Sequence, residues 1–120
     1  MIVPRAFVLA GGLCGAAGVA LSAAAAHAGG GNVATAAAFL LAHAPVFLAV
    51  GLAGSARAMR GGAIVLLVGL VVFAGDLLMR DFAGFRLFPM AAPAGGILMI
   101  LGWLAVAGSA FFADRNPPSP

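Results

Sequence analysis

The sequence predicts an all-α membrane protein in which four transmembrane helices form an up-down bundle. Of its 120 residues, 64% are hydrophobic and 8% are charged, and the mean hydropathy is +1.18. A soluble domain has about a quarter charged residues, so this chain has too few polar side chains to cover a globule in water. Four apolar runs, each near the length of about twenty residues that crosses a bilayer, are separated by short polar or glycine-rich segments.

The first two spans are expected at about residues 6–27 and 33–55, in a single domain that covers residues 1–113. The first span resembles a secretory signal, because Arg5 precedes an apolar run that ends in small residues. The run is long for a signal core, so we interpret it as a retained helix, with cleavage as the alternative. Small residues four apart predict close helix contacts on this span: Gly11 with Gly15, and Gly18 with Ser22.

The third and fourth spans are expected at about residues 61–80 and 93–112, followed by a polar, proline-rich tail at 114–120. Between these spans, aromatic rings alternate with arginines, which is typical of a short segment at the membrane interface. The residues expected at the interface are Phe82, Phe85, Arg86 and Phe88. A docking surface for a partner subunit is the alternative for this segment.

The basic residues are all arginines, and they flank the apolar runs instead of forming one basic face. This distribution argues against a nucleic-acid partner and indicates residues that set the topology. Four of them lie on the side of the two termini and two on the other side: Arg5, Arg57, Arg60 and Arg115, against Arg80 and Arg86. The positive-inside rule therefore predicts cytoplasmic termini, and the composition is typical of a bacterial inner-membrane protein.

Asp76 lies inside the third apolar run, where a carboxylate is a candidate functional residue because burying it is costly. The first hypothesis is that Asp76 binds protons or cations in the interior of the bundle. The second hypothesis is that Asp76 forms a structural ion pair with Arg80, because side chains four residues apart face each other on a helix. We favour the ion pair.

The two histidines, His27 and His43, are candidate ligands for a metal or a haem. A bis-histidine haem needs both rings at one depth, whereas His43 is expected about 15 Å deeper in the bilayer than His27. We therefore expect no cofactor and no metal, with the rings hydrogen-bonded to the backbone or to Asp76. A contact between His43 and Asp76 is the specific expectation, because both are placed in the same half of the bundle.

The last two spans carry three short motifs: Phe73-Ala74-Gly75, Pro93-Ala94-Gly95-Gly96 and Gly102-Trp103-Leu104. With these motifs the chain resembles the family called domain of unknown function 423, whose relatives include the transmembrane-protein-256 proteins. The resemblance covers nearly the whole chain and implies a four-helix integral membrane protein. The chain departs from the family pattern at Ala74, Asp76 and Ala92, where the family has serines and a threonine, so no role is carried over to Asp76.

The small or rigid residues of these motifs, together with the single tryptophan, are expected to mediate helix packing. They are Gly75, Pro93, Gly95, Gly96, Gly102 and Trp103. For the tryptophan, which is placed within a span, we expect packing against a groove lined by glycines.

The sequence shows no Ser/His/Asp set in a recognisable context, no phosphate-binding loop and no pair of acidic residues, so we expect a protein that is not an enzyme. The first functional hypothesis is an accessory or structural subunit that packs against partner helices in a larger membrane complex. The alternative is a small homo-oligomeric transporter or channel that uses Asp76, with His43, to handle protons or cations. The expected partners are the lipid bilayer and either other membrane subunits or further copies of the chain.

Overall fold

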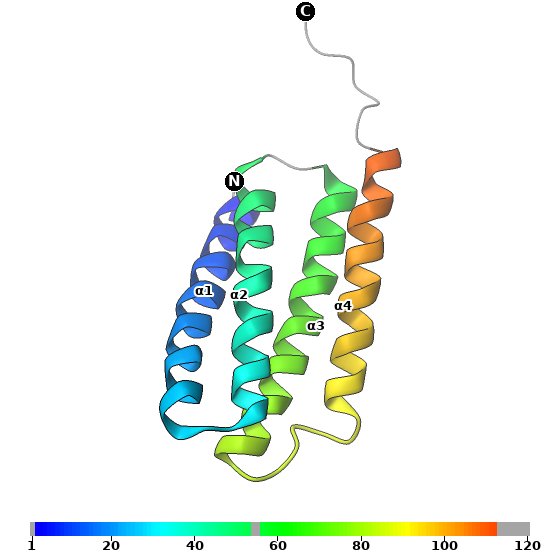
Figure 1. Ribbon diagram of the computed structural model, residues 1–120. Coiled ribbons are helices and arrows are strands. Elements are labelled where there is room, and N and C mark those ends of the chain that lie inside the picture. Colours follow the sequence, from blue (N-terminus) through cyan, green and yellow to red (C-terminus); the bar gives the residue numbers. More distant parts are fainter. Residues whose placement is uncertain (1, 54–55, 113–120) are drawn as a thin grey trace, which may run out of the picture.

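A computed structural model describes residues 2–53 and 56–112 and shows four antiparallel helices in succession (Figure 1). Each of the four is long and apolar enough to cross a membrane, which confirms the predicted fold class. The helices are α1 Ile2–Ala28, α2 Gly31–Leu52, α3 Arg57–Phe82 and α4 Ala91–Gly108, and a short 3-10 helix, η1 Ser109–Phe111, follows α4. The predicted tail at 114–120 lies outside the described residues.

The ends of the helices differ from the expected spans by a few residues. α1 begins at Ile2 and α3 at Arg57, four residues earlier than expected in each case, while α2 already ends at Leu52. Hydropathy locates the apolar centre of a span, but helical hydrogen bonds are local, so the helix continues into polar flanking residues.

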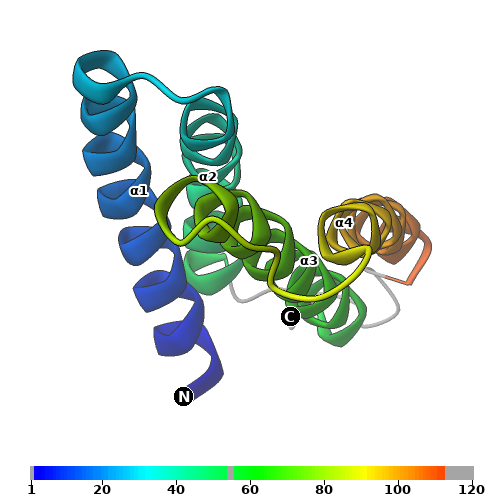
Figure 2. The ribbon, with the colours of Figure 1, turned by 90° about the horizontal axis from the view of Figure 1, so that it is seen from below.

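The four helices form an open row instead of a closed ring. α1 packs on α2, α2 on α3 and α3 on α4, and no other pair of these helices has backbones in contact. Figure 2, a view along the helices, shows α1 and α4 at the two ends of this row. We call the end of the molecule that carries the α1–α2 turn and the α3–α4 loop, residues 83–90, the loop end (Figure 1).

Glycines seven residues apart bring α3 and α4 together. A Cβ added at Gly69 would lie 2.8 Å from the carbonyl oxygen of Gly95, and a Cβ added at Gly95 would lie 2.6 Å from the backbone nitrogen of Phe73. One heptad along, Gly102 faces Leu66 at the same close range. In lipid the hydrophobic effect does not drive helices together. The close approach of the two backbones supplies van der Waals contacts that stabilise the pair instead.

The contact between α1 and α2 uses the same spacing, which corrects the expected pairs. Gly11 and Gly18 are buried, and a Cβ at either would clash with a leucine of α2. Gly15 makes only an ordinary contact, 3.8 Å from Cβ of Ala44, and Ser22 is exposed. The structure therefore confirms close approach at Gly11 and Gly18 but not at Gly15 and Ser22, because nearly antiparallel helices return to the same contact line every two turns.

Three of the residues expected to mediate packing in α3 and α4 do not touch a neighbouring helix closely. Pro93 is exposed in the first turn of α4, and a Cβ added at Gly96 would meet nothing within 4 Å. Gly75 faces only Leu87 of the α3–α4 loop, 3.9 Å from a Cβ placed on it. The motif residues therefore divide between the helix contact, the α3–α4 loop and the open side of α4, because neighbouring positions on a helix point to different faces.

Candidate functional site

Asp76 of α3 is fully buried, and its carboxylate accepts hydrogen bonds from three donors. Arg80 Nη2 donates to one oxygen at 2.8 Å, and the backbone N–H of Leu87 donates to the other, also at 2.8 Å. The backbone N–H of Ala92 also donates to this carboxylate. The ion pair with Arg80 confirms the structural hypothesis for the local partner of Asp76, and the two backbone donors come from the loop and from α4.

The start of α4 explains why a carboxylate is needed there. The first N–H groups of a helix have no partner within it, and the N-cap of α4, Met90, has a left-handed backbone and gives no side-chain cap. Ala92 lies in this first turn, where the helix dipole favours a negative charge. Asp76 therefore caps α4 from a neighbouring helix.

Asp81, one turn further along α3, serves the start of α2 in the same way. Its two carboxylate oxygens accept hydrogen bonds from Asn32 Nδ2 at 2.9 Å and from the backbone N–H of Val33 at 3.1 Å. The N-cap of α2 is Gly30, which has no side chain to offer. Thus two aspartates at the end of α3 cap the two helices that begin at the loop end.

The role of Asp81 was not predicted from the sequence, although the sequence contains a signal for it. Both helices that begin at the loop end lack a Ser, Thr, Asp or Asn at the N-cap position, where such residues are strongly preferred. Two carboxylates lie nearby in sequence at the end of the third apolar run. When a helix starts without a local cap and an unassigned carboxylate lies nearby, the pattern indicates that a side chain of another helix supplies the cap.

His43 of α2 is hydrogen-bonded through both ring nitrogens near the middle of the membrane span. Trp103 Nε1 of α4 donates to His43 Nε2 at 3.2 Å, so the other nitrogen carries the proton and Nδ1 donates to the carbonyl oxygen of Phe39 at 2.7 Å. The indole and imidazole rings are tilted, with centroids 5.7 Å apart. This pair joins α2 to α4 across α3, although the backbones of α2 and α4 are not in contact.

The expected contact between His43 and Asp76 was wrong, because the two lie at different depths. Asp81 and Val33 lie at about the same depth in the bundle, because the backbone N–H of Val33 donates a hydrogen bond to the Asp81 carboxylate. From that level His43 lies about 15 Å along α2, whereas Asp76 lies about 8 Å along α3. Each side chain finds its partners at its own depth.

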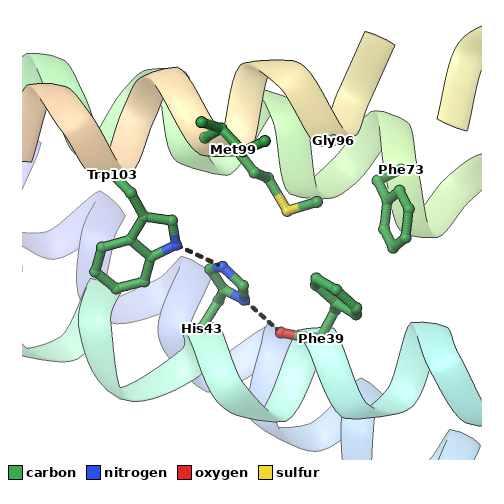
Figure 3. A pocket seen from close by; sticks show the side chains of 7 residues that line it. Phe39, His43, Phe73, Gly96, Met99 and Trp103 are labelled. Atoms are coloured by element: carbon green, nitrogen blue, oxygen red, sulfur yellow. Dashed lines mark hydrogen bonds between the residues drawn. The ribbon is translucent and has the colours of Figure 1, made fainter. Parts of the chain in front are cut away.

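A groove of about 300 Å³ opens between α2 and α4 beside this pair (Figure 3). Its lining is almost entirely apolar: Phe39, His43, Phe73, Gly96, Met99, Ile100 and Trp103. The indole of Trp103 is 43% exposed and forms a wall of the groove, and Gly96 leaves space where a side chain would stand. The expected packing of the tryptophan against glycines was wrong: Gly95 and Gly102 face α3, and Gly96 only lines the same open groove, with nothing within 4 Å of a Cβ placed on it.

The remaining candidate residues lie at the loop end. His27 is exposed in the last turn of α1, far from His43. Among the described residues, no three His, Cys, Asp or Glu side chains are placed to hold a metal ion. The residues predicted for the interface are all exposed at this end of the molecule: Phe82, Phe85, Arg86 and Phe88.

Four apolar helices in an up-down row, with charges confined to their ends or paired, define a small multi-pass membrane protein. A family model described as "Protein of unknown function (DUF423)" matches residues 14–96. The chain belongs to this family, as its motifs predict. Neither the curated proteins nor the solved structures gave a match to the chain.

Proposed function

We propose that this protein is a non-catalytic subunit whose outer helices pack against helices of a larger membrane complex. The observation that carries the proposal is the open row. In the most apolar stretch of α1 and of α4, 22% of residues are buried, against 39% in α2 and 44% in α3. Among the described helices, α1 and α4 each have backbone contact with one other long helix, so most of their apolar surface is available to other molecules.

The outward face of α1 supports a protein partner for part of this surface. Small residues follow one another along it at helical spacing, and all are exposed: Gly12, Ala16, Ala20 and Ala23. A Cβ added at Gly12 would meet nothing within 4 Å, so another backbone has room to approach. Faces of small residues are typical of contacts between membrane helices, where van der Waals contact between closely approaching backbones, and not the hydrophobic effect, stabilises the pair.

The state of Asp76 supports a structural role over transport. A transport path needs a carboxylate that faces a polar cavity, whereas this one accepts three hydrogen bonds and has no exposed surface. The groove beside His43 is lined by apolar atoms. Both ring nitrogens of His43 are already hydrogen-bonded, to Phe39 and to Trp103, which supports a structural role for this residue.

We also propose that the protein lies in a bacterial inner membrane with both termini in the cytoplasm. Arg57 and Arg60 begin α3 at the same end of the molecule as the start of α1, which carries Arg5 (Figure 1). Arg80 and Arg86 lie at the loop end. The larger number of arginines on the side of the termini supports this orientation.

The test is purification of the tagged chain from its native membrane in mild detergent, with the stoichiometry of what co-purifies. We expect a defined set of other subunits, and we expect Gly12→Leu to lower their yield at least tenfold. Leucine favours the helix more than glycine does, so the loss would not reflect unfolding. Val71→Leu, which adds volume to an exposed site on α3, is the matched control and should retain the complex.

Two results would contradict the proposal. If the chain purifies only with copies of itself, the subunit role fails and the transporter hypothesis gains, with Asp76→Asn in a flux assay as the next experiment. If other subunits co-purify but Gly12→Leu retains them as fully as Val71→Leu does, the outward face of α1 is not the contact.

A further inference from the structure

The α3–α4 loop does not project away from the helices, because Asp76 holds it back. The backbone N–H of Leu87, in the middle of the loop, is bonded to Asp76 Oδ1, which lies about 9 Å along α3 from Phe82, the last residue of that helix. The loop therefore folds back along the last turns of α3 (Figure 1).

The charges of α3 place this loop relative to the bilayer. Arg60 and Arg80 are separated by about 30 Å of helix, which equals the thickness of the hydrocarbon core. Arg80 therefore marks the boundary at the loop end, with Asp76 one turn inside it. The loop extends from the end of α3, just outside this boundary, back to the level of Asp76, just inside it, so it lies where the headgroups meet the upper acyl carbons.

The exposed side chains of this segment suit that region. Phe82, Phe85 and Phe88, which we call the aromatic cluster, are 67%, 60% and 45% exposed, and within residues 2–53 and 56–112 their rings stack on no other aromatic ring. Aromatic residues beside arginines at the surface of a bilayer place their rings among the upper acyl carbons and their charges among the headgroups.

Arg86 supplies the charge. It is exposed, and among the described residues it has no carboxylate partner, because Asp76 is paired with Arg80 and Asp81 binds the start of α2. A guanidinium offers two parallel N–H donors that match a phosphate. We propose that the α3–α4 loop is a binding site for anionic phospholipid, in which Arg86 binds the headgroup phosphate while the aromatic cluster inserts between the acyl chains.

This inference is independent of the proposed subunit role, since it concerns the lipid on one side of the membrane and not the helix contacts. The test uses a protein with one tryptophan, made by Trp103→Phe and Phe85→Trp, reconstituted in vesicles of phosphatidylcholine with and without phosphatidylglycerol. Brominated acyl chains, on one lipid or on the other, quench a tryptophan that they touch, and acrylamide quenches one in water. Phe88→Trp is the second reporter in case the first variant does not fold.

We expect blue-shifted emission, protection from acrylamide, and quenching by brominated phosphatidylglycerol about fivefold stronger, at equal mole fraction, than by brominated phosphatidylcholine. Arg86→Gln should remove this preference and leave the insertion unchanged, while Arg57→Gln at the other end should retain both. Emission typical of water with full acrylamide quenching would overturn the insertion. A lipid preference that survives Arg86→Gln would overturn the phosphate site, and a reporter protected from both quenchers would show that protein covers the loop.

Discussion

The capping role of Asp76 gives a prediction that can be worked out from its contacts. In Asp76→Ala, Arg80 loses its partner at 2.8 Å, and the backbone N–H groups of Leu87 and Ala92 lose their acceptor. A hydrogen bond to a charged group contributes about 1.5–3 kcal/mol. Because the Arg80 side chain is 29% exposed and its charge can be solvated, we take the low end of this range for the bonds to Arg80 and Leu87 and expect a loss of at least about 3 kcal/mol in the free energy of unfolding.

The substitution Asp76→Asn separates the two contributions. An asparagine oxygen can still accept from Leu87, while the charge that pairs with Arg80 is gone, so we expect about half the loss seen with alanine. Arg80→Gln leaves the backbone bonds in place and should cost about 1 kcal/mol. If the ion pair acts as a unit, the loss in the double variant Asp76→Asn/Arg80→Gln is smaller than the sum of the single losses.

The assay is reversible unfolding in mixed micelles of a mild detergent and dodecyl sulfate, followed by circular dichroism and by the fluorescence of Trp103. Because Trp103 lies in α4, its signal reports the hairpin that Asp76 holds together. A loss below about 0.5 kcal/mol for Asp76→Ala, the size of an ordinary surface substitution, would refute the capping argument. So would an unchanged position of the α3–α4 loop in the variant, measured by proteolysis of the loop.

Three further predictions concern the contacts between helices. Gly95→Ala should cost about 2 kcal/mol or more by thermal unfolding, because its Cβ would meet backbone at 2.6 Å, whereas the matched change Gly96→Ala should be neutral or stabilising by up to about 1 kcal/mol; equal effects would contradict the close approach. Trp103→Phe should cost about 0.6 kcal/mol and change the tautomer balance of His43, measured by ¹⁵N NMR; an unchanged imidazole spectrum would count against this bond. Asp81→Ala should cost about 1 kcal/mol and increase hydrogen exchange in the first turn of α2 only, and uniform exchange would argue against a cap.

The contacts of the two carboxylates differ in how far the sequence alone predicts them. The pair between Asp76 and Arg80 was predictable, since helix geometry alone places side chains four apart on one face. The bonds to Leu87 and from Val33 to Asp81 join residues on different elements, and no periodicity in the sequence reveals them. The sequence shows that the N-cap positions of α2 and α4 lack a capping side chain, but it does not show that α3 supplies the caps.

The histidine illustrates the same limit within the bilayer. The sequence predicted that the His43 ring is hydrogen-bonded to the backbone or to Asp76, with Asp76 as the specific expectation. The structure has the backbone bond, to Phe39, and it has Trp103 in place of Asp76. The choice depends on which residues of different helices share a depth. That depth follows from where each helix begins, and those positions are fixed by the contacts at the loop end.

The sequence by itself determined four membrane-crossing helices, their order and the ion pair within α3, because helical hydrogen bonds are local and the bilayer sets the length of an apolar span. Only the tertiary structure decided the open row, the glycine contacts seven residues apart and the bonds between helices. In water, the apolar face of a helix identifies the side that is buried. In these spans every face is apolar, since lipid accepts any of them, so the pattern of hydrophobic residues does not select a neighbour and backbone fit between small residues does.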